Sequence, residues 1–143
     1  MPQKLTNYYQ VMIIKHLSEH KKIWFCFALS WTILIAFLCL VKDSDLPSIG
    51  IKVSGLDKVV HFGFHFIFIL LWAIYFFASR KVLTIKLIAT LVFCSFIFGV
   101  SIELLQGIYT TTRQADVFDV LSNTFGALVA GSIASKILKK QSN

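Results

Sequence analysis

Four charged residues gather directly after an uncharged stretch at 87–102: Glu103, Arg113, Asp116 and Asp119. Carboxylates can act as general acids or bases, and they can also bind a cationic group. An arginine can bind a carboxylate through two parallel hydrogen bonds, and a histidine such as His61 can carry protons near neutral pH. These residue types are suited to acid–base chemistry or to ligand binding, provided that the fold brings them together.

Helical periodicity predicts that three segments each place polar or small residues on one face. Residues three or four apart lie on the same side of a helix. The stripes are Asp57, His61 and His65; Gly99, Glu103 and Gln106; and Asp116, Asp119, Asn123, Gly126 and Ala130. Polar faces are costly against lipid, so we expect the stripes to meet inside a bundle.

The composition indicates an integral membrane protein. The chain of 143 residues is 57% hydrophobic and 15% aromatic, well above the usage of soluble domains. A helix needs roughly 20 apolar residues to cross a hydrocarbon core of about 30 Å. Four segments meet or approach that length: 23–41, 59–79, 83–108 and 117–138. Nothing alternates as transmembrane strands would, so we predict an all-α fold, a polytopic membrane bundle of four transmembrane helices. We expect Trp31, Trp72 and the other large aromatic residues to face lipid or to form interfacial belts.

The net charge of +7 is explained by membrane topology, because the basic residues flank the spans and form no stripe typical of nucleic-acid binding. Most of the 14 Lys and Arg residues lie before the first span, between the second and third, or after the fourth. All acidic residues except Glu19 lie on the other side. The positive-inside rule then places both termini in the cytoplasm and turns the loops at 42–58 and 109–116 outward.

These spans predict one membrane domain with short flanks. We expect a cytoplasmic or interfacial segment at 1–22, a four-helix membrane domain at 23–138 and a cytoplasmic tail at 139–143. The segment 8–17 mixes apolar and basic residues, which favours a short interfacial helix over disorder. No cleavable signal peptide is readable, so the first span is the expected insertion signal.

The central residues leave alternatives open. Glu103 and Arg113 form either a structural ion pair between the third and fourth spans or a site in which Glu103 acts as a general base or binds a cationic head group. His61 is either an interior histidine, held by Asp57 or by an acid of the fourth span, or a proton shuttle. Asp116, or Thr112, is placed to cap the fourth span.

A metal site is chemically possible, because imidazole and carboxylate ligands suit zinc or manganese. Its ligands would be His61, Glu103, Asp116 and Asp119. The sequence has no HExxH or other tight ligand spacing, so no metal and no cofactor are predicted. No hydroxyl or thiol lies in a recognisable nucleophile motif either.

Three separated motifs resemble the VanZ-like family of teicoplanin-resistance-associated integral membrane proteins. They are DKVVHF at 57–62, ELLQ at 103–106 and RQADVFDVLSNTFGA at 113–127. The resemblance runs from about 57 to 138, and it implies a set of signature positions: Asp57, Lys58, His61, Glu103, Gln106, Arg113, Asp116, Asp119, Asn123 and Gly126. His65 stands where many members have an aromatic residue such as tyrosine, and GIYTTTR precedes Arg113 where a proline and glycine turn is common.

The sequence and the resemblance together favour one function and leave a second open. The first is an outward-facing pocket in the bacterial cytoplasmic (inner) membrane that binds or shields an envelope lipid component, associated by resemblance with glycopeptide (teicoplanin) resistance. The alternative is an intramembrane enzyme that modifies a lipid-linked envelope component, with Glu103 or Asp119 as base and His61 as acid. A structural role ranks lower, and transport ranks lowest because the polar stripes stop in the outer half.

The expected partners follow from these two functions. They are membrane lipids or lipid-linked envelope components, a glycopeptide antibiotic only indirectly, and a second copy of the chain in a homo-oligomer. No nucleic-acid partner is expected.

Overall fold

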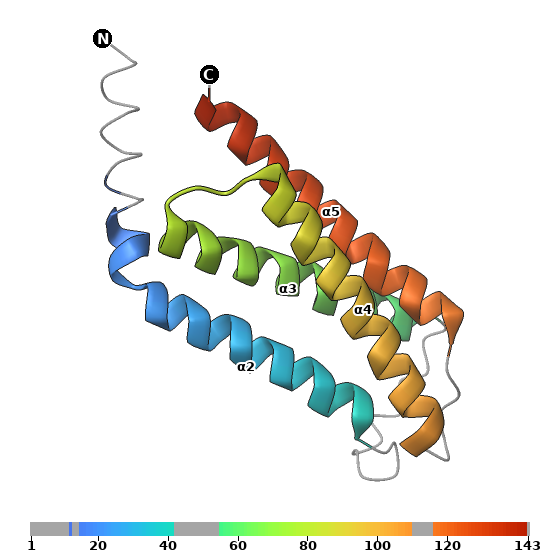
Figure 1. Ribbon diagram of the computed structural model, residues 1–143. Coiled ribbons are helices and arrows are strands. Elements are labelled where there is room, and N and C mark those ends of the chain that lie inside the picture. Colours follow the sequence, from blue (N-terminus) through green and yellow to red (C-terminus); the bar gives the residue numbers. More distant parts are fainter. Residues whose placement is uncertain (1–11, 13–14, 42–54, 110–115, 143) are drawn as a thin grey trace.

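The described residues of the protein form four long helices. The computed structural model describes residue 12 and residues 15–41, 55–109 and 116–142, with side chains described up to Lys136. The helices are α2 (Lys21–Leu40), α3 (Leu56–Arg80), α4 (Ile85–Tyr109) and α5 (Val117–Ser142) (Figure 1). Each is long and apolar enough to cross a membrane, α5 through Val117–Lys136. The prediction of an all-α bundle with four spans is confirmed, and the chain is a multi-pass membrane protein.

The helix ends differ from the predicted spans by only a few residues. Helix α3 begins at Leu56, earlier than predicted, and so includes Asp57 and Lys58. These two charged residues are tolerated in a first turn because they pair with each other and lie at the end of the bundle. Of the predicted interfacial helix at 8–17, Met12 and residues 15–17 are helical, and the rest lies outside the described residues.

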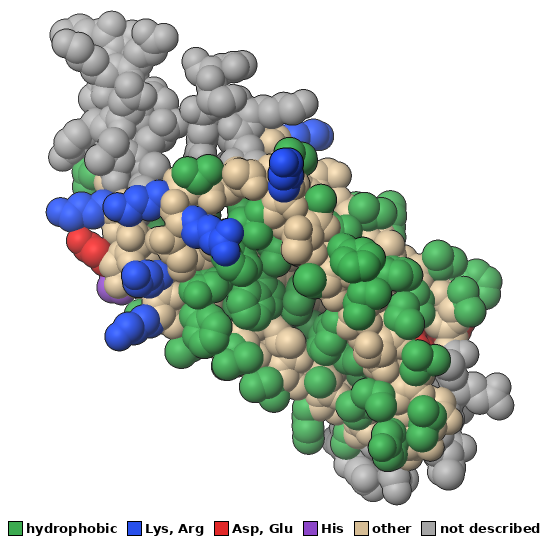
Figure 2. All heavy atoms as spheres, in the orientation of Figure 1, with side chains coloured by type: hydrophobic (Ala, Val, Ile, Leu, Met, Phe, Trp, Pro, Cys, Tyr) green, Lys and Arg blue, Asp and Glu red, His purple; other side chains and the backbone are tan. Residues whose placement is uncertain are grey.

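The start of α2 and the end of α5 lie at the same end of the bundle (Figure 1). Lysine and arginine side chains gather at this end, over the start of α2, the turn between α3 and α4, and the end of the described part of α5 (Figure 2). We call it the basic end, after Lys21, Lys22, Arg80, Lys81, Lys86 and Lys136. The opposite end, where α3 and α5 begin and α4 finishes, is called the acidic end.

The bundle exposes large apolar side chains and buries small or polar ones. Phe37, Phe93 and Phe125 are each more than 60% exposed, whereas Ala127 and Asn123 are almost completely buried. This is the reverse of a soluble domain, because lipid surrounds the outer surface and only the interior can satisfy polar groups. The green apolar surface of Figure 2 covers the middle of the bundle accordingly.

Helices α3 and α5 approach most closely at Gly126. A Cβ atom added there would lie 2.2 Å from the carbonyl oxygen of Phe62 on α3, closer than such atoms come. Ala127 and Ala130, both fully buried, continue the narrow face of α5. The expected role of Gly126 in close helix approach is therefore confirmed, and Ala130 is buried on the same face.

Hydrogen bonds from two tryptophan side chains connect α2 and α3. The indole N–H of Trp31 donates to the carbonyl of Phe64 at 3.0 Å, and that of Trp72 donates to the Thr32 hydroxyl at 3.2 Å. Both tryptophans are half-buried, and their N–H groups find partners between α2 and α3. That their rings face lipid or form interfacial belts stays a prediction. An indole inside an apolar bundle needs such a partner, which periodicity alone does not supply.

Candidate functional site

Polar side chains from α3 and α5 meet at the acidic end around one ammonium group. The Nζ atom of Lys58 lies 3.0 Å from Asp57 Oδ2, 2.9 Å from Asp116 Oδ2 and 3.0 Å from Asp119 Oδ1. We call these four residues the rim cluster. Its side chains are between 14% and 56% exposed, so the cluster is partly open to the surroundings. One positive charge faces three carboxylates.

Asp116 connects the rim cluster to the helix that follows it. Its Oδ1 atom accepts the backbone N–H of Phe118 at 2.8 Å, which confirms Asp116 as the cap of α5. The hydrogen bond from Lys58, together with that N–H, lowers the pKa of the Asp116 carboxyl below its ordinary value. The cap therefore stays ionised at neutral pH, where a negative charge at a helix N-terminus is favourable.

Three buried polar residues lie further into the bundle, one on each of α3, α4 and α5. We call His61, Glu103 and Asn123 the floor cluster; their exposed fractions are 7%, 3% and 1%. His61 Nδ1 lies 3.1 Å from Asn123 Oδ1, and its Nε2 lies 3.7 Å from Asp119 Oδ2. Asp119 therefore belongs to the rim through one oxygen and reaches the floor through the other.

Glu103 holds the start of α5 against the end of α4. Its Oε2 atom accepts the backbone N–H of Asp116 at 3.1 Å. Its Oε1 atom is buried and has no hydrogen-bond partner among the residues that the structure describes. One potential ligand atom from each of His61, Glu103 and Asp119 lies within 4.8 Å of the others. Acidic and basic groups thus share a small, partly enclosed volume.

The structure brings together most of the residues that the sequence singled out. Those that meet at the acidic end are Asp57, Lys58, His61, Glu103, Asp116, Asp119 and Asn123. Gln106 instead donates from its side-chain amide to the carbonyl of Cys39 at 2.6 Å, linking α4 to the last turn of α2. Arg113 lies outside the described residues, and so does its expected pairing with Glu103.

The two histidines of α3 have different partners. His61 is an interior histidine, as one alternative held: it is hydrogen-bonded to the Asn123 amide, and Asp119, an acid of the fourth span, lies 3.7 Å from its Nε2. Asp57 was expected as a holder and instead contacts Lys58. His65 lies one turn deeper and bonds the Ser95 hydroxyl at 2.7 Å, outside both clusters.

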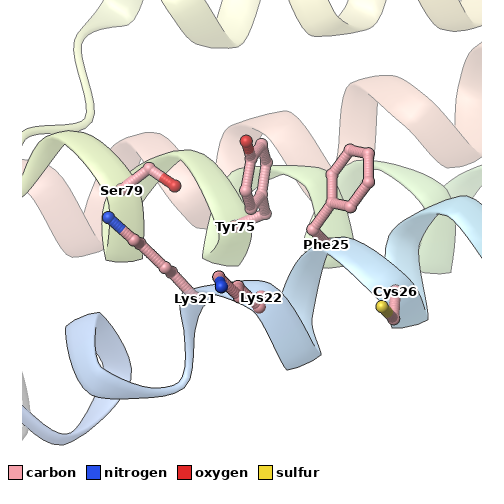
Figure 3. A pocket seen from close by; sticks show the side chains of 6 residues that line it. All are labelled: Lys21, Lys22, Phe25, Cys26, Tyr75 and Ser79. Atoms are coloured by element: carbon pink, nitrogen blue, oxygen red, sulfur yellow. The ribbon is translucent and has the colours of Figure 1, made fainter.

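Sequence reasoning missed a cavity of about 510 Å³ at the basic end, between α2 and α3. It is lined by Lys21, Lys22, Phe25, Cys26, Tyr75 and Ser79, and the aromatic rings of Phe25 and Tyr75 lie side by side with centroids 5.3 Å apart (Figure 3). The available signal was the pair of lysines shortly before the first aromatic residues of the first span. That pattern is common at membrane interfaces and does not distinguish a cavity from a belt.

Four apolar helices around a buried polar cluster at one end define a small multi-pass membrane protein with an intramembrane polar site. A family model described as VanZ/LLP1 matches residues 5–139, nearly the whole chain. The protein belongs to the VanZ/LLP1 family, as the three motifs predicted. Neither the curated proteins nor the solved structures compared with it gave a match.

Proposed function

We propose that this VanZ/LLP1 protein binds or shields an envelope lipid component at the acidic end of its bundle, and that this activity underlies an association with glycopeptide (teicoplanin) resistance. The observation that carries the proposal is the graded polar site: a partly exposed rim cluster lies above a buried floor cluster in an otherwise apolar bundle. Ionisable groups inside a membrane are costly and usually mark a functional site.

The charge distribution supports an outward-facing site. Basic residues collect at the opposite end of the bundle (Figure 2), which by the positive-inside rule is the cytoplasmic end. Both chain termini are then cytoplasmic, and the rim cluster meets the outer leaflet. A site there would face the head groups of that leaflet.

The charge and the neighbouring surface suggest which part of a lipid would bind. Among the described residues of the site, Asp57, Asp116, Asp119 and Glu103 are acidic and Lys58 is the one cation beside them. This excess of carboxylates favours a head group with ammonium or hydroxyl donors. An apolar groove of about 450 Å³ runs between α4 and α5 from the level of Thr124 and is suited to an acyl chain.

Teicoplanin susceptibility tests the proposal directly. Cells producing the wild type should be less susceptible than cells without it, and Glu103→Gln should abolish the protection while keeping side-chain shape. Ser101→Ala is the matched control, because Ser101 lies on the same helix, is exposed, and donates to the carbonyl of Ile97 within that helix. All variants are compared at equal amounts of folded membrane protein.

The outcomes separate the parts of the proposal. Protection by wild type and Ser101→Ala but not by Glu103→Gln supports a functional charge at the site. Equal protection by all three shows that the Glu103 charge is dispensable, and no protection by the wild type removes the link to resistance.

The second candidate function, an intramembrane enzyme, is favoured by one observation. The His61 Nε2 and Asp119 Oδ2 atoms are 3.7 Å apart with Glu103 beside them, so an acid and a base converge in a partly enclosed site. An enzyme predicts that mass spectrometry of lipid-linked envelope components shows a modified species in cells with the wild type. His61→Gln should abolish that species, and identical spectra with and without the protein would exclude the enzymatic alternative.

A further inference from the structure

The space enclosed by His61, Glu103 and Asp119 has the donor set of a metal centre. We propose that these three side chains bind one divalent transition-metal cation, of the class of Mn²⁺ or Zn²⁺. The proposal goes beyond the lipid-binding function and does not depend on it, because it concerns the protein and the ion alone.

The geometry of the three ligands fits a single ion. Their ligand atoms lie within 4.8 Å of one another, and His61 Nε2 and Asp119 Oδ2 are 3.7 Å apart. Ligands about 2.1 Å from a tetrahedral metal are roughly 3.4 Å from each other. The side chains therefore need only small movements to close on an ion, and three protein ligands leave a coordination position open.

Asn123 determines which ring nitrogen of His61 carries the hydrogen. The amide oxygen of Asn123 can only accept a hydrogen bond, so Nδ1 of His61 carries the hydrogen in this contact of 3.1 Å. In the neutral imidazole, Nε2 is then an unprotonated acceptor directed toward Asp119. Metal-binding histidines are oriented in this way, with the other ring N–H donating to an oxygen. Asn123 is thus the positioning residue of the proposed site.

In each of the two carboxylates, one oxygen atom is bonded to a neighbouring group and the other is available to an ion. Asp119 uses Oδ1 for Lys58 and keeps Oδ2 toward His61. Glu103 uses Oε2 for the Asp116 N–H, while its buried Oε1 has no hydrogen-bond partner among the described residues. A buried carboxylate oxygen without a partner is costly, and a cation offsets that cost.

A proton shared by His61 and Asp119 would satisfy fewer of these atoms than a metal ion. One proton between His61 and Asp119 would still leave Glu103 Oε1 unpaired, whereas one cation can contact all three. A second set of neighbouring carboxylates, Asp57, Asp116 and Asp119, already shares one cation, the Lys58 ammonium. The ligands come from three different helices, which explains why no tight ligand spacing is visible in the sequence.

Metal titration of the purified full chain in detergent, after removal of bound ions with a chelator, tests the proposal. We expect about one Mn²⁺ per chain by electron paramagnetic resonance, and about one Zn²⁺ by elemental analysis after gel filtration. His61→Gln, Glu103→Gln and Asp119→Asn should each weaken binding by about tenfold or more. His65→Gln is the control, because His65 lies on the same helix outside the site and bonds Ser95.

Unfolding in the absence of metal shows which variants fold. Glu103 and His61 are buried, so the Glu103→Gln or His61→Gln variant could fail to fold. In that case the test uses Asp119→Asn, because the Asp119 side chain is half-buried. The proposal is overturned if no stoichiometric ion binds, or if Asp119→Asn and His65→Gln bind the ion as the wild type does. Because no lipid or antibiotic is present, failure here leaves the lipid-binding proposal untouched, and failure of the susceptibility test leaves the metal site untouched.

Discussion

Replacing Gly126 with alanine should lower the free energy of unfolding by about 3 kcal/mol, at the upper end of what overpacking of a tight interior costs. The added Cβ would lie 2.2 Å from the Phe62 carbonyl oxygen, and its nearest neighbours are all backbone atoms of α3. Backbone cannot rotate away as a side chain can, so α3 and α5 must separate. Unfolding of the variant in mixed micelles, followed by circular dichroism, measures the loss.

Gly63→Ala is the matched control for this experiment. Gly63 also lies in the interior of a long helix, yet a Cβ added there meets nothing within 4 Å. Alanine has the higher helix propensity, so this variant should be as stable as the wild type or more stable by up to about 1 kcal/mol. Equal losses in the two variants would mean that helix–helix contact at Gly126 is not what stabilises the pair.

Replacing Glu103 with alanine should lower the free energy of unfolding by about 2 kcal/mol, because it removes a charge-assisted hydrogen bond at the start of α5. The Asp116 N–H would lose the acceptor that lies 3.1 Å away on α4. Glu103→Gln keeps an oxygen for that N–H and turns an amide donor toward His61 and Asp119, so its stability should match the wild type.

Comparison of the two variants separates the hydrogen bond from the charge. Thermal unfolding of both proteins in the same detergent, without added metal, gives the difference. If glutamine destabilises as strongly as alanine, the ionised carboxylate, and not an oxygen acceptor alone, is what holds α4 to α5.

The sequence was sufficient to predict the helices and the convergence of their polar faces. Apolar length determines a membrane span, and the period of a helix determines which side chains share a face, so His61, Glu103, Asp119 and Asn123 were expected to meet. Neither rule depends on how far one helix is shifted along its neighbour.

That axial shift decides the individual contacts, and there the sequence was insufficient. Lys58 lies beside Asp57 and off its helical stripe, so periodicity gave no reason to expect an ammonium bonded to three carboxylates; only the family resemblance pointed to it. The pairing of Gln106 with the Cys39 carbonyl and of Trp31 with the Phe64 carbonyl depends equally on relative helix positions. Backbone acceptors carry no sequence signature.

The close approach at Gly126 has a consequence for mutational tolerance. The carbonyl that it meets belongs to Phe62, the residue after His61, and Asn123 lies about one turn before it on α5. The spacing between the imidazole on α3 and the amide and carboxylate on α5 is therefore set by a residue that has no side chain. Selection for activity should reject every larger residue at 126, including those that a screen for expression alone would accept.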